Sequence, residues 1–301
     1  MIEAAVIGLR WVQYVSAVAA LGLPLFQVYP LRALTWSLGT RLAVAAGLLL
    51  ATGALCGVLA QTAMMAGGWA AALDPAALGY VVQSTGLGMA NVARAALALI
   101  GVTVLVLGQG ERPLSSLAIL AFAGALASFA WSGHGAATEG TAGLVHLMAD
   151  IAHLLAAAVW LGALVGFCLL LFRPVAGEIL LASRALSGFA ALGTGAVAVL
   201  AVTGALNASF LIGDDGLGLI TRSTWGILLI AKLALFALML ALAAHNRFTL
   251  APALSRAVDG GTVAQDQIRR LKISVGLEML AGVALLGLVA AMGVQMPPAS
   301  M

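Results

Sequence analysis

The sequence predicts an all-α polytopic membrane protein, a bundle of about eight transmembrane helices with both termini on the outer side. Only 25 of its 301 residues carry a formal charge, 14 as Lys or Arg and 11 as Asp or Glu. A soluble protein of this length would carry about 75. Hydrophobic residues make up 63% of the chain, and the mean hydropathy is +1.11. Too few polar side chains remain to cover a surface in water, which excludes a soluble enzyme, a nucleic-acid-binding protein and a disordered chain.

Eight apolar runs are long enough to cross a bilayer, whose hydrocarbon core of about 30 Å takes about 20 residues of helix. We expect these spans at residues 4–28, 41–66, 84–108, 114–132, 142–172, 183–211, 223–245 and 273–296. Turn-forming or charged residues separate them, in chain order at Tyr29-Pro30, Gly67-Gly68, Asp74-Pro75, Gly110-Glu111-Arg112-Pro113, Arg173-Pro174 and Gly260-Gly261. The longest polar stretch, from about 246 to 272, is too short for a second domain, so residues 1–301 are predicted to form a single transmembrane domain.

Basic residues between the spans are strongly biased to one side of the predicted bundle. Such residues mark the cytoplasmic side of a membrane protein. One side holds only Arg222. The other side holds Arg32, Arg41, Arg112, Arg173, Arg184, Arg247, Arg256, Arg269, Arg270 and Lys272. We therefore place the larger set in the cytoplasm and both termini on the opposite side.

Four charged side chains lie inside the predicted spans at a similar depth. Counted from the outer end of its helix, each of Arg10, Arg94, Asp150 and Lys232 is about six to ten residues in, or roughly 10–15 Å. Asp150 is the only acid among them, so we expect one or two of the cations to pair with it. Charges at this depth are costly, and they serve either function or a structural network that sets helix register. Glu278 is predicted to lie deeper, where it forms part of an inner gate or pairs with a neighbour.

The fifth span carries two histidines and an acid on one face. At 100° per residue, His146, Asp150, His153, Ala157 and Trp160 fall within a stripe of about 80°. Neutral imidazole ligates transition metals, and a nearby carboxylate can orient it or accept its proton. The two histidines are two turns apart, about 10.5 Å, so they are not expected to chelate one ion together. Either each completes a site with ligands from other helices, or the two serve successive sites on one path.

Further metal donors are predicted at the outer mouth of the bundle. His134 lies in the outward loop Trp131-Ser-Gly-His134-Gly, where the flanking glycines would let its ring reach the fifth span. Met64, Met65 and Met89 end and begin adjacent spans on the same side. Thioethers favour Cu(I), although methionine is also an ordinary apolar residue.

Several sequence motifs that would indicate other functions are missing. The chain has no GxxxxGK[ST] and no Asp-Lys-Thr-Gly, so it is not expected to drive transport with ATP. It also lacks HExxH and GxSxG, which argues against a membrane protease or esterase. We expect no enzymatic activity.

The second half contains a set of motifs that are specific when taken together. They are Ser132-Gly133-His134, His146-Leu-Met-Ala-Asp150-Ile-Ala-His153-Leu-Leu-Ala-Ala-Ala-Val-Trp160-Leu-Gly162, Val202-Thr203-Gly204 with Asn207, Thr224-Trp-Gly226-Ile-Leu-Leu-Ile-Ala-Lys232, Asn246-Arg247 with Pro252, Leu271-Lys-Ile-Ser-Val275-Gly-Leu-Glu278 and Met296-Pro297-Pro298. In these motifs the chain resembles the copper-resistance protein D (CopD) family of bacterial inner-membrane proteins. The first 110 residues match this family only in having spans.

The resemblance implies a copper-binding protein of the bacterial inner membrane, with periplasmic termini and a role in copper homeostasis or resistance. It also implies a permease that moves periplasmic copper toward the cytoplasm, with the copper oxidation state left open. Copper would enter at His134 and His146, pass His153 beside Asp150, and move inward past Lys232 and Glu278. Some relatives carry a fused periplasmic copper-carrier domain. This chain does not, so a CopC-like carrier would be a separate partner.

Two other functions remain open from the sequence. A haem-b electron-transfer protein needs axial ligands that face each other, and the only histidine on another span, His245, is predicted at the cytoplasmic end. A copper sensor or assembly partner would present the metal to other proteins without transporting it. Copper flux through the isolated protein separates this last alternative from a permease.

Overall fold

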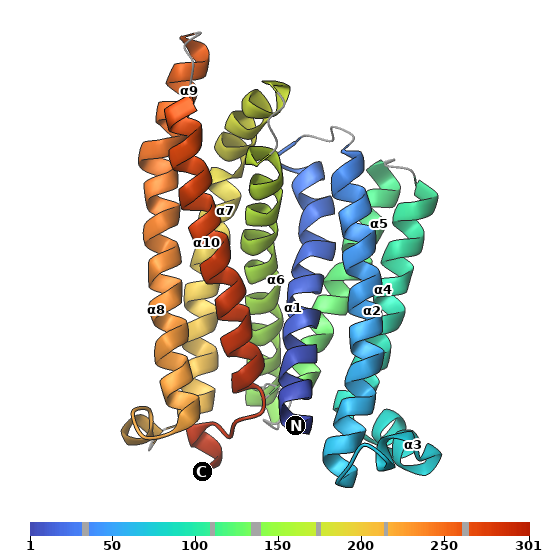
Figure 1. The fold of residues 1–301 in the computed structure, drawn as a ribbon. Coiled ribbons are helices and arrows are strands. Elements are labelled where there is room, and N and C mark those ends of the chain that lie inside the picture. Colours follow the sequence, from blue (N-terminus) through green and yellow to red (C-terminus); the bar gives the residue numbers. More distant parts are fainter. Residues whose placement is uncertain (32–35, 109–111, 134–139, 173–175, 214–215, 261–264) are drawn as a thin grey trace.

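The protein folds into a bundle of long helices (Figure 1). The computed structural model describes residues 1–31, 36–108, 112–133, 140–172, 176–213, 216–260 and 265–301. Within these ranges every regular element is a helix. The all-α polytopic fold predicted from the sequence is therefore confirmed.

Seven helices in the described ranges are long and apolar enough to cross a membrane. They are α1 (Ile2–Val28), α2 (Ser37–Ala66), α4 (Gly86–Gly108), α6 (Gly140–Leu171), α7 (Ala176–Ile212), α8 (Thr224–His245) and α10 (Gln265–Met292). Shorter helices are η1 (Ala71–Leu73), α3 (Pro75–Ser84), η4 (Gly216–Leu219) and η6 (Pro298–Ser300).

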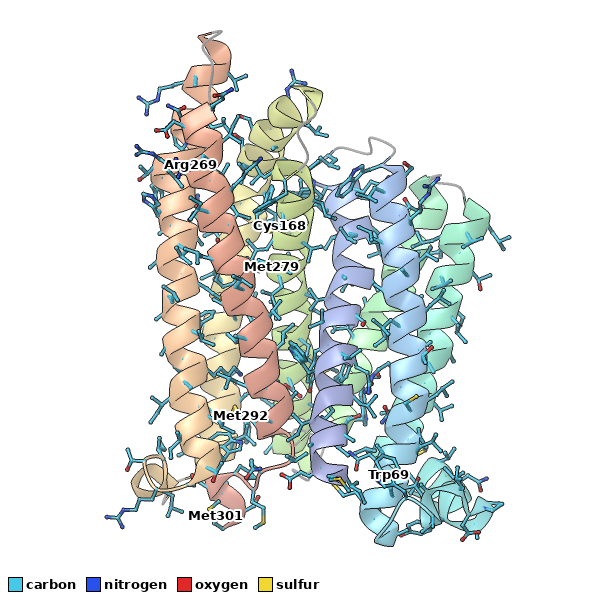
Figure 2. The ribbon with its side chains drawn as sticks, viewed as in Figure 1. Trp69, Cys168, Arg269, Met279, Met292 and Met301 are labelled. Carbon is cyan, nitrogen blue, oxygen red and sulfur yellow. The ribbon has the colours of Figure 1, made fainter. Side chains whose placement is uncertain are left out.

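The remaining predicted span is the helix α5 (Arg112–Ala127), which continues into the 3₁₀ helix η2 (Ser128–Ser132). Both chain termini lie at the same end of the bundle (Figure 1), which requires an even number of passes. Seven long helices give an odd number, so α5 with η2 makes the eighth pass. Met301 and Trp69 lie at the end that holds the termini, and Arg269 lies at the opposite end (Figure 2). We call these the outer and inner ends, following the orientation predicted from the basic residues.

The stretch predicted as a polar connection from 246 to 272 is largely helical. After α8 the chain passes through the π-helix η5 (Asn246–Leu250) into α9 (Ala251–Asp259), and α10 begins at Gln265 rather than at 273. Pro252 lacks the N–H that would continue the α-helical pattern, and Ala251 N–H instead bonds the Asn246 carbonyl five residues earlier. Hydropathy locates the part of a helix inside the bilayer, so it misses the helical turns that extend into water.

The two halves of the chain meet where α1 crosses α6. A Cβ atom added to Gly22 would overlap the backbone of Gly162, and one added to Gly162 would overlap the backbone of Gly22. Small residues allow helix backbones to approach this closely in membrane bundles. α6 is the most buried of the spanning helices, whereas α8 is the least buried and packs mainly against α10. The fold thus places α6 at the centre, between the two halves (Figure 1).

We predict that Gly22→Ala lowers the free energy of unfolding by about 1–3 kcal/mol, because the added methyl group forces α1 away from α6. Thermal unfolding of the purified protein in detergent, followed by circular dichroism, measures the change. Gly8→Ala on the same helix is the control, since nothing lies within 4 Å of the added Cβ atom. Equal stability of the two variants would contradict the proposed close crossing.

Candidate metal site

Two facing stripes of side chains join α6 to α7 in the outer half of the bundle. His146, Asp150 and His153 of α6 lie opposite Phe210, Asn207 and Thr203 of α7, respectively. Each set is spaced at three or four residues, so each occupies one face of its helix, and the antiparallel packing brings the faces together. The stripe predicted on the fifth span therefore points into the bundle, toward α7.

His153 is held in one orientation by the hydrogen bonds of Thr203. Thr203 Oγ1 donates to the Val199 carbonyl at 2.6 Å, so its one hydroxyl hydrogen is already used. The ring atom His153 Nδ1 lies 3.0 Å from the same oxygen and must therefore donate to it. The Nδ1–Cε1 edge of the ring faces α7 near Gly204. In the neutral ring Nε2 then carries the lone pair, the arrangement that a metal-ligating histidine uses.

Asp150 contacts a neutral side chain and not a cation. Asn207 Nδ2 donates to Asp150 Oδ1 at 3.4 Å, and a Cβ atom on Gly133 would lie 3.8 Å from Asp150 Oδ2. Asp150 and Lys232 interact electrostatically, but in the part of the chain that the structure describes the one ion pair within 4.0 Å joins Arg270 to Asp266. The predicted pairing of Asp150 with a cation is thus present only as a longer-range interaction with Lys232, without an ion pair within 4.0 Å in the described residues. An amide neighbour and the Lys232 charge at longer range take the place of that contact.

His146 is a buried side chain nearer the outer end of α6. Its ring stacks on Phe210 with centroids 4.6 Å apart and an angle of 10° between the planes. Such stacking fixes the plane of the imidazole. His134 falls outside the described residues, but Gly133, the residue before it, lies against Asp150. The described segment thus ends, at Gly133, beside the α6 stripe.

A cavity of about 460 Å³ lies next to His153, between α6, α7, α8 and α10. Most of its wall is apolar, and the polar side chains that line it are His153 and Lys232. Met239 also lines it and is buried. His153, Ala157 and Trp160 of the predicted stripe thus face one space, which we call the outer cavity.

A second cavity, of about 480 Å³, lies between the same helices in the inner half. Trp160 lines both cavities and packs edge-on against Phe236 of α8, with ring centroids 5.8 Å apart. We call the second space the inner cavity. Among the described residues, Trp160 is the one that both linings share, so its side chain stands between the two cavities.

Glu278 lines the inner cavity and is hydrogen-bonded to Trp160. Trp160 Nε1–H donates to Glu278 Oε1 at 2.9 Å, and Asn246 Nδ2 donates to Glu278 Oε2 at 2.9 Å. Met279, the next residue, lies in the opposite half of α10 from Met292 (Figure 2). Glu278 thus lies at the inner cavity, and its two hydrogen-bond donors are neutral side chains.

Arg94 forms a separate polar cluster in the first half of the chain. Its guanidinium is 2% exposed and lies over the Phe129 ring, with Cζ 3.5 Å from the ring centroid. It donates hydrogen bonds to Ser128 Oγ at 3.0 Å, Gln13 Oε1 at 2.7 Å, Asn91 Oδ1 at 3.0 Å and Ser132 Oγ at 3.0 Å. Neutral oxygens and an aromatic face thus solvate this charge in place of water.

Arg10 connects this cluster to the end of α10. Arg10 Nη1 donates to the Gly293 carbonyl at 2.8 Å, and Nη2 donates to the Ser132 carbonyl at 2.9 Å. Both carbonyls lie at helix C-termini, where the helix dipole favours a cation. The four charges predicted to form one polar layer therefore belong to two separate groups. Arg10 and Arg94 bind backbone and neutral side chains, while Asp150 and Lys232 face the α6–α7–α8 side.

The remaining candidate donors lie away from the α6 stripe. Met64, Met65 and Met89 are exposed on α2 and α4, which pack mainly against α1, α3 and α5. Their part in a metal-binding mouth stays a prediction. His245 is exposed at the inner end of α8, whereas His153 lines the outer cavity. Among the described histidines these two are not placed to hold a haem between them.

The α7 partners of the stripe were not predicted as site residues from the sequence. The spacing of Thr203, Asn207 and Phe210 mirrors that of the three α6 residues, and this signal could have identified them. Without the antiparallel register of α6 and α7, nothing in the sequence pairs one stripe with the other. Met239 was not among the predicted donors, and the structure places it in the wall of the outer cavity.

We predict that Arg94→Leu lowers the free energy of unfolding by about 3 kcal/mol or more, because it leaves the Gln13 and Asn91 carbonyl oxygens without their donor. Urea or thermal unfolding in detergent measures the loss. Arg222→Leu, at an exposed position, should leave stability nearly unchanged. Wild-type stability of Arg94→Leu would contradict a structural role for this cluster.

Comparisons with known proteins agree with the motifs of the second half and extend to the first. A family model described as "Copper resistance protein D-like, N-terminal domain" matches residues 1–144, and one described as "Copper resistance protein D" matches residues 183–292. The chain is 39% identical over 306 residues to the Copper resistance protein D of Pseudomonas syringae pv. tomato, covering 97% of this chain and 96% of that protein. No solved structure matches the chain. The chain belongs to the copper resistance protein D family.

Proposed function

We propose that this protein is a copper permease of the bacterial inner membrane that takes copper from the periplasm toward the cytoplasm. The observation that carries the proposal is the position of His153. Thr203 fixes its Nδ1–H, which leaves the Nε2 lone pair as the metal-binding atom of a side chain that lines the outer cavity. Beyond Trp160 lies the inner cavity, so the two spaces form an interrupted route through the membrane.

The donors along this route suit copper. His146 and Asp150 lie at its outer end, with His134 as the expected additional donor from the preceding loop. His153 supplies an imidazole, and Met239 supplies a thioether farther in. Imidazole and thioether ligands bind copper in preference to harder cations. In this mechanism copper passes from the first histidine to the second, since the two are too far apart to share one ion.

Lys232 weakens binding in the outer cavity and so favours release. Its ammonium group repels a copper ion at His153, while the Asp150 carboxylate attracts the ion. A conducting site must bind its ion strongly enough to capture it and weakly enough to let it leave. The opposite charges of Asp150 and Lys232 meet both requirements. A separate periplasmic carrier of the CopC type is the expected donor of copper at the outer end.

We predict that the double variant His146→Ala, His153→Ala abolishes the copper accumulation that depends on this protein, because both imidazole ligands of the route are lost. Copper in washed cells, measured by mass spectrometry at equal protein expression, tests this. His245→Ala, on the same bundle but outside the route, is the matched control. Unchanged accumulation in the double variant would overturn the proposed route.

We also predict that Thr203→Val weakens copper binding about 10- to 100-fold, because the acceptor that holds Nδ1–H is removed. Metal titration of the purified protein measures the affinity. Thr52→Val is the control, since Thr52 makes the same backbone hydrogen bond on an exposed face of α2. Wild-type affinity in Thr203→Val would show that His153 is not the ligand held by α7.

Copper flux into proteoliposomes that contain the protein alone decides between a permease and a non-transporting sensor or assembly partner. A permease moves copper across the vesicle membrane, and the His146→Ala, His153→Ala variant does not. Copper binding without flux would favour the sensor or assembly role instead.

A further inference from the structure

Glu278 is a buried acidic side chain whose hydrogen-bond neighbours are neutral. Its side chain is 2% exposed, and its hydrogen-bond donors are the Trp160 indole and the Asn246 amide. No lysine, arginine or histidine of the described chain lies within 4.0 Å of it. A carboxylate accepts about four hydrogen bonds or ion contacts, and two of these positions are taken. A cation at the two open positions would stabilise the ionised carboxylate at this depth.

Two oxygen atoms near Glu278 are buried and have no hydrogen-bond partner. Asn246 donates its amide N–H to Glu278, and its Oδ1 atom, in a residue that is 6% exposed, accepts nothing. Ser274 lies one turn before Glu278 on α10, and its buried Oγ atom is also without a partner. An unpartnered buried acceptor costs about 1–3 kcal/mol. Both oxygens are therefore available to a cation next to the carboxylate.

The chain geometry holds the amide in this place. Asn246 is the first residue of the π-helix η5, where α8 widens before Pro252. Single π turns inside α-helices occur frequently at functional sites. The same residue lines the inner cavity together with Glu278, so an ion and its water ligands can reach both side chains from the inner half.

We propose that Glu278 and Asn246, with Ser274, form a site for a hard monovalent cation, for which sodium is the probe. Carboxylate, amide and hydroxyl oxygens are ligands of hard cations, whereas Cu(I) prefers sulfur and nitrogen. One carboxylate balances one positive charge, so a monovalent ion leaves the buried site neutral and a divalent ion does not. The inner site therefore differs in chemistry from the histidine site of the outer cavity.

The site is also connected to the residue that separates the two cavities. Trp160 donates to the same carboxylate that would bind the cation, so occupancy of the site bears on the Trp160 position. A role for the cation in copper movement rests on the proposed permease function. Cation binding itself does not, because it involves none of the copper ligands.

The test is cation binding to purified, copper-free protein in detergent. We expect sodium chloride, compared with choline chloride at equal ionic strength, to raise Tm saturably, and radioactive ²²Na⁺ to bind with the same concentration dependence. Glu278→Gln should weaken both effects by about tenfold or more, since contacts to a charged group are lost. Asn246→Ala should weaken them as well. Glu3→Gln, at an exposed carboxylate on α1, is the control and should leave them unchanged.

Two results would overturn the site. One is an equal response to sodium and choline with no bound ²²Na⁺, and the other is sodium binding of wild-type strength in Glu278→Gln. Size-exclusion profiles ensure that only folded variants are compared. Copper titration of the same preparations measures the copper site separately. A failure of the sodium site can therefore be distinguished from a failure of the copper site.

Discussion

The hydrocarbon interior of a membrane offers no hydrogen-bond partner, and this constraint governs every polar contact in the bundle. A polar side chain at that depth must be satisfied within the protein, by its own helix or by a neighbouring one. The α6–α7 pairing follows from it, because His153 requires Thr203 and Asp150 requires Asn207. These contacts fix the register of the two helices. That register places the His153 ring, with its Nε2 lone pair, at the outer cavity. The same polar groups thus determine both the packing and the candidate site.

The two halves of the protein satisfy this constraint in different ways. In the first half, Arg94 is surrounded by four neutral oxygens and an aromatic ring, and the polar cluster encloses no large space. In the second half, polar groups line two cavities of several hundred Å³. A fully satisfied network stabilises one arrangement, whereas the partly satisfied groups around Glu278 leave positions for a ligand. The first half therefore supports the structure, and the second half carries the candidate chemistry.

The sequence predicts the membrane fold and the α6 stripe well, since both depend on local patterns. Hydropathy and length locate the spans, and helical periodicity places His146, Asp150 and His153 on one face. Contacts between helices are not predicted by these local patterns. Counting depth along each helix puts Arg10, Arg94, Asp150 and Lys232 at one level, but depth carries no information about which helices are neighbours. The partners of Arg94, the role of Thr203 and the contact between Trp160 and Glu278 all depend on the packing, so sequence patterns could not supply them.

The contact between Gly22 and Gly162 bears on which parts of the protein can move. Backbones that touch cannot slide past each other, so α6 forms one rigid frame with α1 and the first half. The α6 side chains of the two cavities belong to this frame. The opposite wall is α8, which is the least buried spanning helix and packs mainly against α10. α10 is tied to this frame by the Arg10–Gly293 and Trp160–Glu278 hydrogen bonds, so a movement that opens the outer cavity toward the inner one would come from α8, with Phe236 moving away from Trp160.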